Sequence, residues 1–493
     1  MKLLVPLPIV LPLLGSALSL AFHRRVRIQR WIGVVVLVGT LSAGVALLLM
    51  IHQSGSVSTQ IGGWPIPLGI TLVADLFATI MLAVSTAMVL VVLVYAIGSP
   101  TTADEATFFH PVYLMLAAGV SASFLTGDLF NLFVAFEVML TASYVLITLG
   151  GRAEQVRSGM TYVVISLLAS LLFITVIAMV YASTGTVNLA EMATVMPEIH
   201  PGLRQAIGAL LLVVFGIKAA IFPLFFWLPD SYPTAPTPVT AIFAGLLTKV
   251  GVYAIIRTQT LLFPSDGPST LLLSIAGATM LVGVLGAIAQ DDVKRILSFH
   301  IISQIGYMVF GLALFTVAGI AAAIFYIVHH IVVKTTLFLV GGLIEAETGT
   351  GALRRLGGLS HTAPIMAIFF LVAGLSLAGL PPFSGFIAKL ALVQEGLALD
   401  RPFVVGVSLL VSLLTLFSMT KIWAGVFWGS PDEEPPGARI RATSRRTMLI
   451  STGALVTLSL LIAVAAGPIY ELSTQAAVAL FEPGHYVATV GSR

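Results

Sequence analysis

A set of ionisable side chains stands inside long apolar stretches of this 493-residue chain. A charge at the centre of a lipid bilayer costs about 2.5–3.5 kcal/mol on insertion scales, so such a group normally faces a protein interior or a hydrated cavity. Carboxylate, ammonium and imidazole groups can all take up and release protons, so the chemistry they suggest together is proton transfer. These residues are Glu137, Lys218, Lys249, His300, His329, His330, Lys334 and Lys389.

Glu137 and Lys218 suggest a charge pair. Glu137 lies in the middle of LFNLFVAFEVMLTASYVLI, and Lys218 lies in LLVVFGIKAAIFPLFFWLP. Gly216 and Pro223 predict a broken helix around Lys218, and the freed carbonyl groups of a broken helix can solvate a cation. We therefore predict a pair that opens and closes as protons pass. The alternative is a buried carboxylate that only holds two helices together.

Three further segments carry candidates for the same path. Lys249 occupies the middle of FAGLLTKVGVYAI, too deep to reach the membrane surface comfortably. His330 and Lys334 are four residues apart in YIVHHIVVKTTLF and therefore share one helix face. His329 has an equally plausible role as a core histidine. His300, near the start of its span, could connect the cytoplasm to the interior.

A second broken helix is predicted in AGLPPFSGFIAKLALVQEG, where two prolines and a glycine precede Lys389. Lys421 lies close to the end of its span and is expected to extend to the membrane surface. Asp75 and Asp128 also lie near span ends, where capping is as plausible a role as transport.

Composition places all these residues in a polytopic membrane protein. Hydrophobic residues make up 58% of the chain and charged residues 9%, against roughly 25% charged residues in soluble proteins. The mean hydropathy is +1.06. Without cysteines, the chain has no disulfides, Cys-ligated clusters, thiolate zinc sites or c-type haem. We expect no cofactor and no metal site, and the net charge of +3 requires no nucleic-acid partner.

Fourteen spans follow from the hydropathy, since a helix needs about 20 apolar residues to cross the bilayer. With the N-terminus outside, the cytoplasmic connections hold fourteen of the 24 Lys and Arg residues, whereas the outer segments and span ends hold five. This bias satisfies the positive-inside rule and places both termini on the outer side. A short interfacial helix is expected within 183–203. The spans lie near 3–21, 31–51, 69–97, 109–126, 127–149, 159–182, 204–228, 236–257, 270–289, 293–312, 317–344, 363–394, 402–428 and 447–467.

The two broken spans, numbers seven and twelve, indicate an inverted repeat. Lys218 and Lys389 are 171 residues and five spans apart, and an odd number of spans reverses the direction of the helix. Interrupted spans in matching positions are the best sequence pointer to such a repeat. Lys249 and Lys421 would correspond in the same way. We infer two inverted five-helix bundles, spans 4–8 and 9–13, and the segments 1–108 (flanking helices), 109–260 (first bundle), 261–428 (second bundle) and 429–493 (cytoplasmic loop, last span and tail).

Four segments carry a resemblance to a known family: GDLFNLFVAFEVMLTASY, FPLFFWLPDSYPTAPTPVTAIFAGLLTKVGVYAIIR, DDVKRILSFHIISQIGYM and HHIVVKTTLFLVGG. They resemble the antiporter-like family, which includes proton-pumping membrane subunits of respiratory complex I and the large subunits of Mrp-type cation/proton antiporters. The resemblance implies fourteen helices with the seventh and twelfth broken. It also implies a Glu–Lys pair on helices five and seven, lysines on helices eight and twelve, and a His-x-x-x-Lys motif on helix eleven. The matching residues are Glu137, Lys218, Lys249, Lys389, His330 and Lys334.

Within this family the segment WLPDSYPTAPTPVTAIFAGLLTKVG is most similar to the Mrp branch. The complex I M-type subunit usually has Glu where this chain has Lys389, and the L-type and Mrp A-type subunits are longer. The N-type subunit and a hydrogenase-linked homologue remain alternatives. The Mrp resemblance implies a non-enzymatic subunit of a hetero-oligomer of about six or seven kinds of subunit in a bacterial plasma membrane.

Three functions therefore compete. The leading one is proton translocation within a multisubunit Na⁺/H⁺ antiporter, with H⁺ and Na⁺ as the transported ions. The second is a proton-pumping membrane subunit of NADH-quinone oxidoreductase or of a related membrane hydrogenase. The third is a membrane scaffold whose buried charges only hold helices together. The carboxylates are too scattered to predict a Na⁺ site, because Na⁺ prefers several oxygen ligands.

Overall fold

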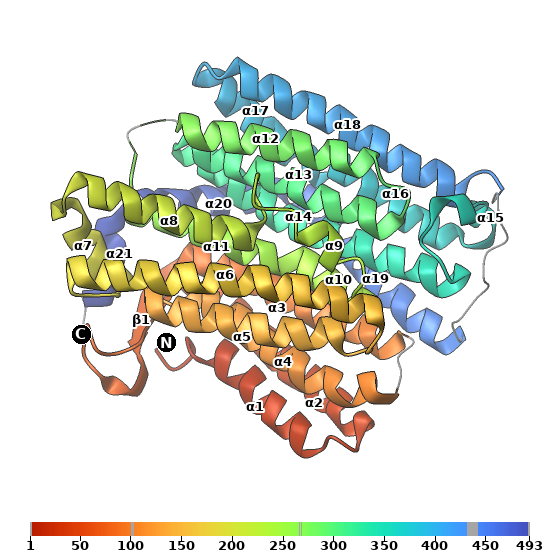
Figure 1. Cartoon of the computed structure of the whole chain (residues 1–493), viewed down its shortest axis with the longest axis horizontal. Coiled ribbons are helices and arrows are strands. Elements are labelled where there is room, and N and C mark those ends of the chain that lie inside the picture. Colours follow the sequence, from red (N-terminus) through yellow and green to blue (C-terminus); the bar gives the residue numbers. More distant parts are fainter. Residues whose placement is uncertain (1, 100–102, 266, 268, 431–441, 492–493) are drawn as a thin grey trace.

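The computed structural model describes residues 2–99, 103–265, 267, 269–430 and 442–491. It is built almost entirely of helices whose axes lie roughly parallel to one another (Figure 1). Twelve helical segments in these ranges are long and apolar enough to cross a membrane. They are α2 (Val26–Ser54), α3 (Leu76–Gly98), α4 (Ala103–Leu125), α5 (Leu129–Thr148), α6 (Ala153–Thr184), α8 (Pro201–Ala219), the continuous α10, η3 and α11 (Thr237–Leu261), α12 (Thr270–Ile288), α13 (Val293–Leu314), α14 (Val317–Thr348), α18 (Pro402–Phe427) and α19 (Ala442–Val464).

Shorter elements complete the described part of the chain. Two shorter apolar helices are α1 (Leu7–Ala21) and α16 (Pro364–Ala378). The all-helical polytopic architecture is thus confirmed, whereas the count of fourteen spans and the inverted repeat stay predictions. Most of the predicted cytoplasmic loop 429–446 lies outside the described residues. The remaining elements are β1 (Val57–Gln60), η1 (Ile61–Gly63), β2 (Thr71–Ala74), α7 (Leu189–Val195), η2 (Met196–Glu198), α9 (Leu228–Ser231), η4 (Leu353–Arg355), α15 (Leu359–Thr362), α17 (Ser384–Ala398), α20 (Ala466–Phe481) and α21 (Pro483–Gly491).

Three local predictions are confirmed. The first break lies where expected, because α8 ends at Ala219 and Ala220 takes a left-handed conformation with φ of 58°. The second lies between α16 and α17, where Gly379 has φ of 85°. Glycine and proline stop regular helices for steric reasons, so the sequence marks both breaks. The short helix α7 lies within 183–203, as predicted.

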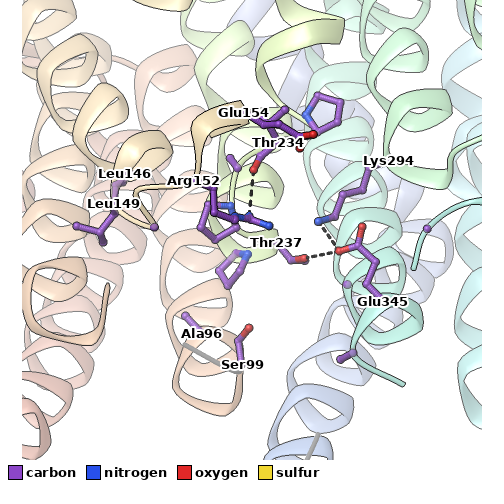
Figure 2. A pocket seen from close by; sticks show the side chains of 18 of the residues that line it. Ala96, Ser99, Leu146, Leu149, Arg152, Glu154, Thr234, Thr237, Lys294 and Glu345 are labelled. Carbon is purple, nitrogen blue, oxygen red and sulfur yellow. Dashed lines mark hydrogen bonds and ion pairs between the residues drawn. The ribbon is translucent and has the colours of Figure 1, made fainter. Parts of the chain in front are cut away.

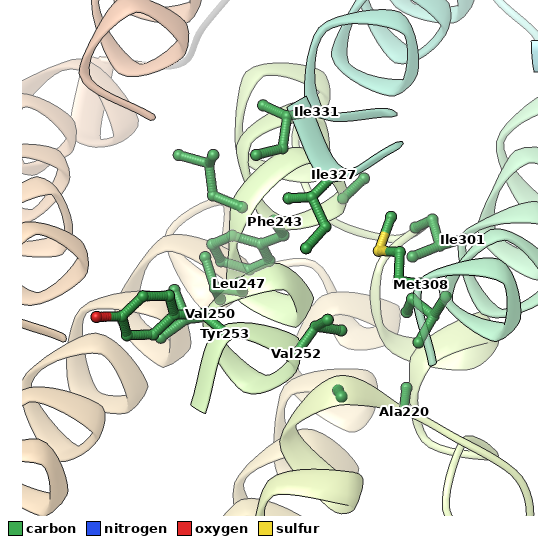
Figure 3. Packing of buried hydrophobic residues seen from close by; sticks show 14 of the residues in the cluster. Ala220, Phe243, Leu247, Val250, Val252, Tyr253, Ile301, Met308, Ile327 and Ile331 are labelled. Carbon is green, nitrogen blue, oxygen red and sulfur yellow. The ribbon is translucent and has the colours of Figure 1, made fainter. Parts of the chain in front are cut away.

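A third irregularity was not predicted. Residues Phe243–Leu247 form the single π-helical turn η3 inside the span that carries Lys249. Such turns are rare and often lie at functional sites. A Cβ on Gly245 would overlap the hydroxyl group of Thr335 on α14, so glycine lets the two helices approach closely. Figure 3 shows Phe243 of this turn in one apolar cluster with Ile327 of α14.

Helix α14 forms the centre of the fold (Figure 1). Nearly every residue of its 32 is buried, and it packs against α3, α10, α13, α16, α17, α19 and α20. A helix that is apolar all round belongs in the interior of a large protein. Its few polar residues are therefore held inside the helix bundle, away from the surrounding lipid.

Asp75 and Arg257 join two distant helices by a buried ion pair. The Asp75 carboxylate caps α3 by accepting a hydrogen bond from the Ala78 N–H. Arg257 of α11 reaches its two oxygens with contacts of 2.6 and 2.8 Å. Arg257 also donates to the Tyr253 hydroxyl, which in turn donates to the Phe124 carbonyl. This pair fixes α3 against α11 without taking part in the deeper cluster of charges.

The Arg257→Gln variant tests this interpretation. We expect a clear fall in the midpoint of heat aggregation, because removing one partner of a buried pair costs about 3–5 kcal/mol. Arg295→Gln is the control, since the Arg295–Asp230 pair has side chains that are 44% and 62% exposed and is worth at most about 1 kcal/mol. Fluorescence-detected size exclusion of heated, detergent-extracted protein measures both variants. Equal midpoints would contradict the account.

Candidate functional site

Lys249, Lys334 and His330 meet at the contact between the π-turn and α14. All three side chains are fully buried. The Lys249 ammonium donates to the Ala244 carbonyl at 2.5 Å and to the Thr248 hydroxyl at 3.2 Å. Because Ala244 belongs to the π-turn, the irregular backbone supplies the oxygen that solvates this cation.

Two of these groups lack a hydrogen-bond partner among the described residues. The Lys334 ammonium and both ring nitrogens of His330 make no hydrogen bond to the described residues. The Lys334 ammonium lies 5.7 Å above the centre of the Phe338 ring. His330 lies within electrostatic range of Lys249 and Lys334. Buried polar atoms are nearly always hydrogen-bonded to protein or to ordered water. These atoms therefore mark the place where water would complete the site.

The second break builds the seat of Lys389. Its ammonium donates to the carbonyl groups of Leu377 and Ala378 at 3.1 and 3.0 Å, at the C-terminus of α16, and to the Ser412 hydroxyl at 3.1 Å. A helix C-terminus carries partial negative charge, which favours a cation. The ammonium also lies 4.7 Å above the ring of Tyr307. The break thus creates the oxygen cage that lets α17 carry a buried lysine.

His329 connects the same break to α14. Its Nδ1 lies 2.8 Å from the hydroxyl of Ser384, the first residue of α17, and its Nε2 has no partner among the described residues. His330 also lies within electrostatic range of His329 and Lys389. The structure therefore brings together five of the predicted residues, which we call the central row: Lys249, His329, His330, Lys334 and Lys389.

Glu137 and Lys218 form a separate group beside α6. Among the described residues no ion pair of 4.0 Å or less joins them. Glu137 instead accepts a hydrogen bond from Ser170, and the Lys218 ammonium lies 3.5 Å from the Ser166 carbonyl, which is 3.0 Å from the same Ser170 hydroxyl oxygen. The direct contact in the predicted pair is thus replaced by an α6 bridge, which sequence reasoning missed.

The Glu137 carboxylate also borders a hollow on the outside of this chain. The hollow has a volume of about 440 Å³ and is lined mostly by apolar side chains of α1, α4 and α5, among them Leu20, Met115 and Val134. Glu137 is only half-buried as a result. Glu137 and Lys218 are the two members of the predicted set that are not fully buried.

His300 lies within electrostatic range of Lys334 and Lys389 in the central row, whereas Lys421 lies apart from it. His300 is fully buried on α13, and its Nε2 lies 2.8 Å from the Ser418 hydroxyl of α18. Lys421 donates to the carbonyl groups of Ile288 and Gln290 and pairs with Asp291 at 2.9 Å, with 28% of its side chain exposed. Lys421 thus bonds the end of α12 near the surface, as expected from its place near the end of its span, and its suggested correspondence with Lys249 stays a prediction.

A cavity lined by both charged and apolar side chains opens on the side that carries the basic loops (Figure 2). Its volume is about 770 Å³. On its wall Lys294 pairs with Glu345 at 2.5 Å, and the Thr237 hydroxyl lies 3.5 Å from the same carboxylate. Helix α10 starts at Thr237 and leads to Lys249, twelve residues or about 18 Å further along the helix. The cavity thus brings solvent to the helix that ends in the π-turn.

No group of three or more His, Cys, Asp or Glu side chains in the described ranges could hold a metal ion. Comparisons with known proteins give matches over most of the chain. Residues 126–415 match the family model described as NADH:quinone oxidoreductase/Mrp antiporter, TM. The D-type subunit of the Na(+)/H(+) antiporter of Alkalihalophilus pseudofirmus is 45% identical over 493 residues, which cover 99% of each chain.

Two solved structures share the fold over the whole chain. A chain in the Mrp complex from Dietzia sp. DQ12-45-1b superposes with a TM-score of 0.92 at 35% identity and covers 100% of both chains. A chain of the membrane-bound sulfane sulfur reductase, an archaeal respiratory membrane complex, gives a TM-score of 0.91 at 26% identity and covers 99% of this chain and 100% of that one.

Gly251→Ala tests how tightly the first break is packed. A Cβ at this position of α11 would lie 2.6 Å from the Ala219 nitrogen, at the end of α8 beside Lys218. We expect a thermal destabilisation of about 1–3 kcal/mol, as for overpacked cores, measured by circular dichroism. Gly406→Ala is the control, since its added Cβ meets no other residue of the described chain within 4 Å. A Gly251→Ala melt that matches the control would show that the break has room to move.

Proposed function

Because the chain belongs to the NADH:quinone oxidoreductase/Mrp antiporter family, and within it to the D-type subunits of Na⁺/H⁺ antiporters, we propose that it conducts the protons of a hetero-oligomeric Na⁺/H⁺ antiporter. Protons would move along a mid-membrane row of ionisable groups that half-channels connect to the two sides. The names of the relatives support a transporter component rather than a catalytic enzyme.

The observation that supports this proposal is a set of buried lysine ammonium groups that form no ion pair with a carboxylate of the described residues. In the described part of the chain, no carboxylate lies within 4.0 Å of the ammonium groups of Lys249, Lys334 and Lys389. A scaffold would pair such charges, as the same protein pairs Arg257 with Asp75. An unpaired buried charge is expensive, and a purely structural role gives no reason to keep three of them.

The arrangement suggests how charge would move. A positive charge on Lys249 raises the free energy of a second one on Lys334 or His330, since the groups are close and poorly screened. A proton that arrives at one group would therefore favour release from its neighbour. Lys389, held by helix-end carbonyl groups and the Ser412 hydroxyl, is the last member of the row.

Glu137 and Lys218 would join this transfer from the other side. Ser170 and Ser166 link the two charges through α6, so a small movement of either side chain could replace the bridge by a direct contact. Opening and closing of this contact would change the charge that the central row experiences.

We further propose that Na⁺ crosses partly or wholly through other subunits, of which about six or seven kinds would form the assembly in a bacterial plasma membrane. Both termini of this chain would lie on the outer side. No shared carboxylate site for Na⁺ is expected in this chain, because its three carboxylates near or within spans lie apart. Asp75 and Asp128 each cap a helix, and Glu137 borders the apolar hollow. A sodium ion bound at Glu137 in the assembled complex would contradict this division.

A second candidate function is a proton-pumping subunit of a redox complex. It is favoured by the matching fold of the sulfane sulfur reductase chain, although at 26% identity against 45% for the antiporter relative. Gene neighbours separate the two functions. Small cation-antiporter subunits beside the gene would support the first, and NADH or quinone subunits would support the second.

Single substitutions in the intact complex test the leading function. Glu137→Gln, Lys218→Met, Lys249→Met and Lys389→Met each keep side-chain volume but remove the proton-carrying group. We expect Na⁺- and Li⁺-driven pH gradients in everted vesicles, read with a fluorescent amine dye, to fall at least tenfold, or by about 1.4 kcal/mol in barrier height, with normal assembly.

Lys421→Met is the matched control, because Lys421 lies outside the row and pairs with the exposed Asp291. It should keep most of the exchange. Variants of the four tested residues that assemble poorly, yet exchange normally per complex, would instead support the scaffold function.

A further inference from the structure

Arg30 borders the cavity of Figure 2 without an acid beside it. It lies four residues inside the start of α2, and its side chain is partly buried, whereas Arg27, one turn earlier, is exposed. No described residue forms an ion pair with the Arg30 guanidinium group, and its Nε atom is buried without a hydrogen bond. Such a group is costly to bury alone, so the cavity wall carries a cation that is expected to bind an anion.

His110 of α4 adds a second polar group beside Arg30. Only 4% of His110 is exposed, it borders the same cavity, and its Nδ1 makes no hydrogen bond to the described residues. Arg30 and Gly33 are three residues apart and share one face of α2. A Cβ on Gly33 would lie 3.8 Å from His110 Nδ1, and His110 lies within electrostatic range of Arg30. The two groups therefore meet in one part of the wall, which we call the Arg30–His110 corner.

The packing of three helices holds this corner in place. Gln29 of α2 is fully buried and donates from its side-chain amide to the Thr107 carbonyl of α4 at 3.1 Å. Tyr113 of α4 donates to the Val89 carbonyl of α3 at 2.8 Å. A binding site that is built on packed helices is held more precisely than one on loops. The corner is therefore fixed by contacts that do not involve its two unpartnered groups.

The acids that border the cavity are already engaged or exposed. Glu345 pairs with Lys294, and Asp292 caps the start of α13. Glu154 is exposed to solvent. The guanidinium group of Arg152, in contrast, makes only a 3.4 Å contact with a backbone carbonyl (Figure 2). Two guanidinium groups of this wall thus have no carboxylate partner among the described residues, and the cavity favours a negatively charged ligand.

The size and lining of the cavity favour a phospholipid headgroup over a small free anion. Its volume of about 770 Å³ is far more than a single phosphate ion fills. Apolar side chains of α4 and α5 lie in the same wall, namely Phe109, Leu146 and Leu149. Basic pockets between membrane helices on the side of the positive loops suit lipid headgroups, and arginine matches phosphate oxygens with two parallel N–H bonds. The apolar side chains would contact the glycerol and the first acyl carbons.

From these observations we infer that the Arg30–His110 corner binds a phosphate group, and that its source is an anionic phospholipid. The Arg30 guanidinium group would donate to the two free oxygens of the phosphodiester, and His110, with its proton on Nδ1, would donate to one of them. The lipid would thereby join α2, α4 and α5 on the side of the basic loops. This inference concerns binding alone and does not depend on the proposed function.

Binding of short-chain lipids to the intact, detergent-solubilised complex tests this site. Dihexanoyl phosphatidylglycerol, which is anionic, and dihexanoyl phosphatidylcholine, which has no net charge, are titrated below their micelle concentrations. Inorganic phosphate is the free anion in a third titration. Microscale thermophoresis with a fluorescent label on another subunit gives each dissociation constant. We expect phosphatidylglycerol to bind at least about fivefold more tightly than phosphatidylcholine, and inorganic phosphate to bind more weakly than phosphatidylglycerol.

Two variants locate the binding. Arg30→Gln should weaken phosphatidylglycerol binding at least about fivefold. Arg27→Gln is the matched control, because it removes the same charge from the same helix at an exposed position, and it should weaken binding less than about twofold. His110→Gln should also weaken binding, and it keeps the test decisive if the Arg30 variant does not assemble. Size exclusion of each complex reports assembly.

The outcomes separate the site from its occupant. Inorganic phosphate that binds as tightly as phosphatidylglycerol, with the same dependence on Arg30, would support the phosphate site and overturn a lipid as its occupant. Equal affinity for the two lipids, or equal losses in Arg30→Gln and Arg27→Gln, would overturn the site itself. None of these readouts measures ion exchange, so a failure of the proposed function is seen separately.

Discussion

The cost of holding an ammonium group inside a membrane protein without an acid beside it determines much of this structure. Lys249 and Lys389 meet this cost in the same way, with backbone carbonyl groups that a regular helix would not release. The π-turn supplies the Ala244 carbonyl, and the end of α16 supplies two more. Lys334 has no such cage and lies over Phe338. The irregular backbone and the buried cations therefore depend on each other. Regular helices would take the carbonyl oxygens away from the ammonium groups, and without the lysines these carbonyl oxygens would have no cation to solvate.

Charges at the ends of the helices are treated differently from those at the centre. Asp75–Arg257, Lys294–Glu345 and Arg445–Glu347 are complete ion pairs that join α3 to α11, α13 to α14, and α14 to α19. A complete pair holds its protons and fixes the helices that carry it. The central row contains only basic groups, so under the proposed function its members would exchange protons while the ion pairs around them hold the helices in place. This division between fixed and exchangeable charge is a stronger argument for transport than the presence of charge alone.

Sequence reasoning found what local rules can mark. Glycine and proline residues locate both helix breaks. Ionisable residues within apolar segments locate the central row, because burying a charge costs free energy wherever that residue lies in the chain. Contacts between helices were beyond its reach. The π-turn carries no proline, and the serine bridge between Glu137 and Lys218 requires α6 to pass between them. Lys421 looked equivalent to Lys249 by its offset, yet its depth depends on where α12 ends. Tyr307, whose ring lies 4.7 Å from the Lys389 ammonium, was overlooked because neutral polar residues in a span are common.

Water between the members of the central row is what the whole account requires. A density map of the assembled complex, at a resolution that places ordered water, tests this most directly. The account predicts water molecules that bridge Lys249, His330 and Lys334 and continue to Lys389, with partners at the ring nitrogens of His330. Dry apolar packing around these four side chains, with no water within hydrogen-bond distance of any of them, would contradict it.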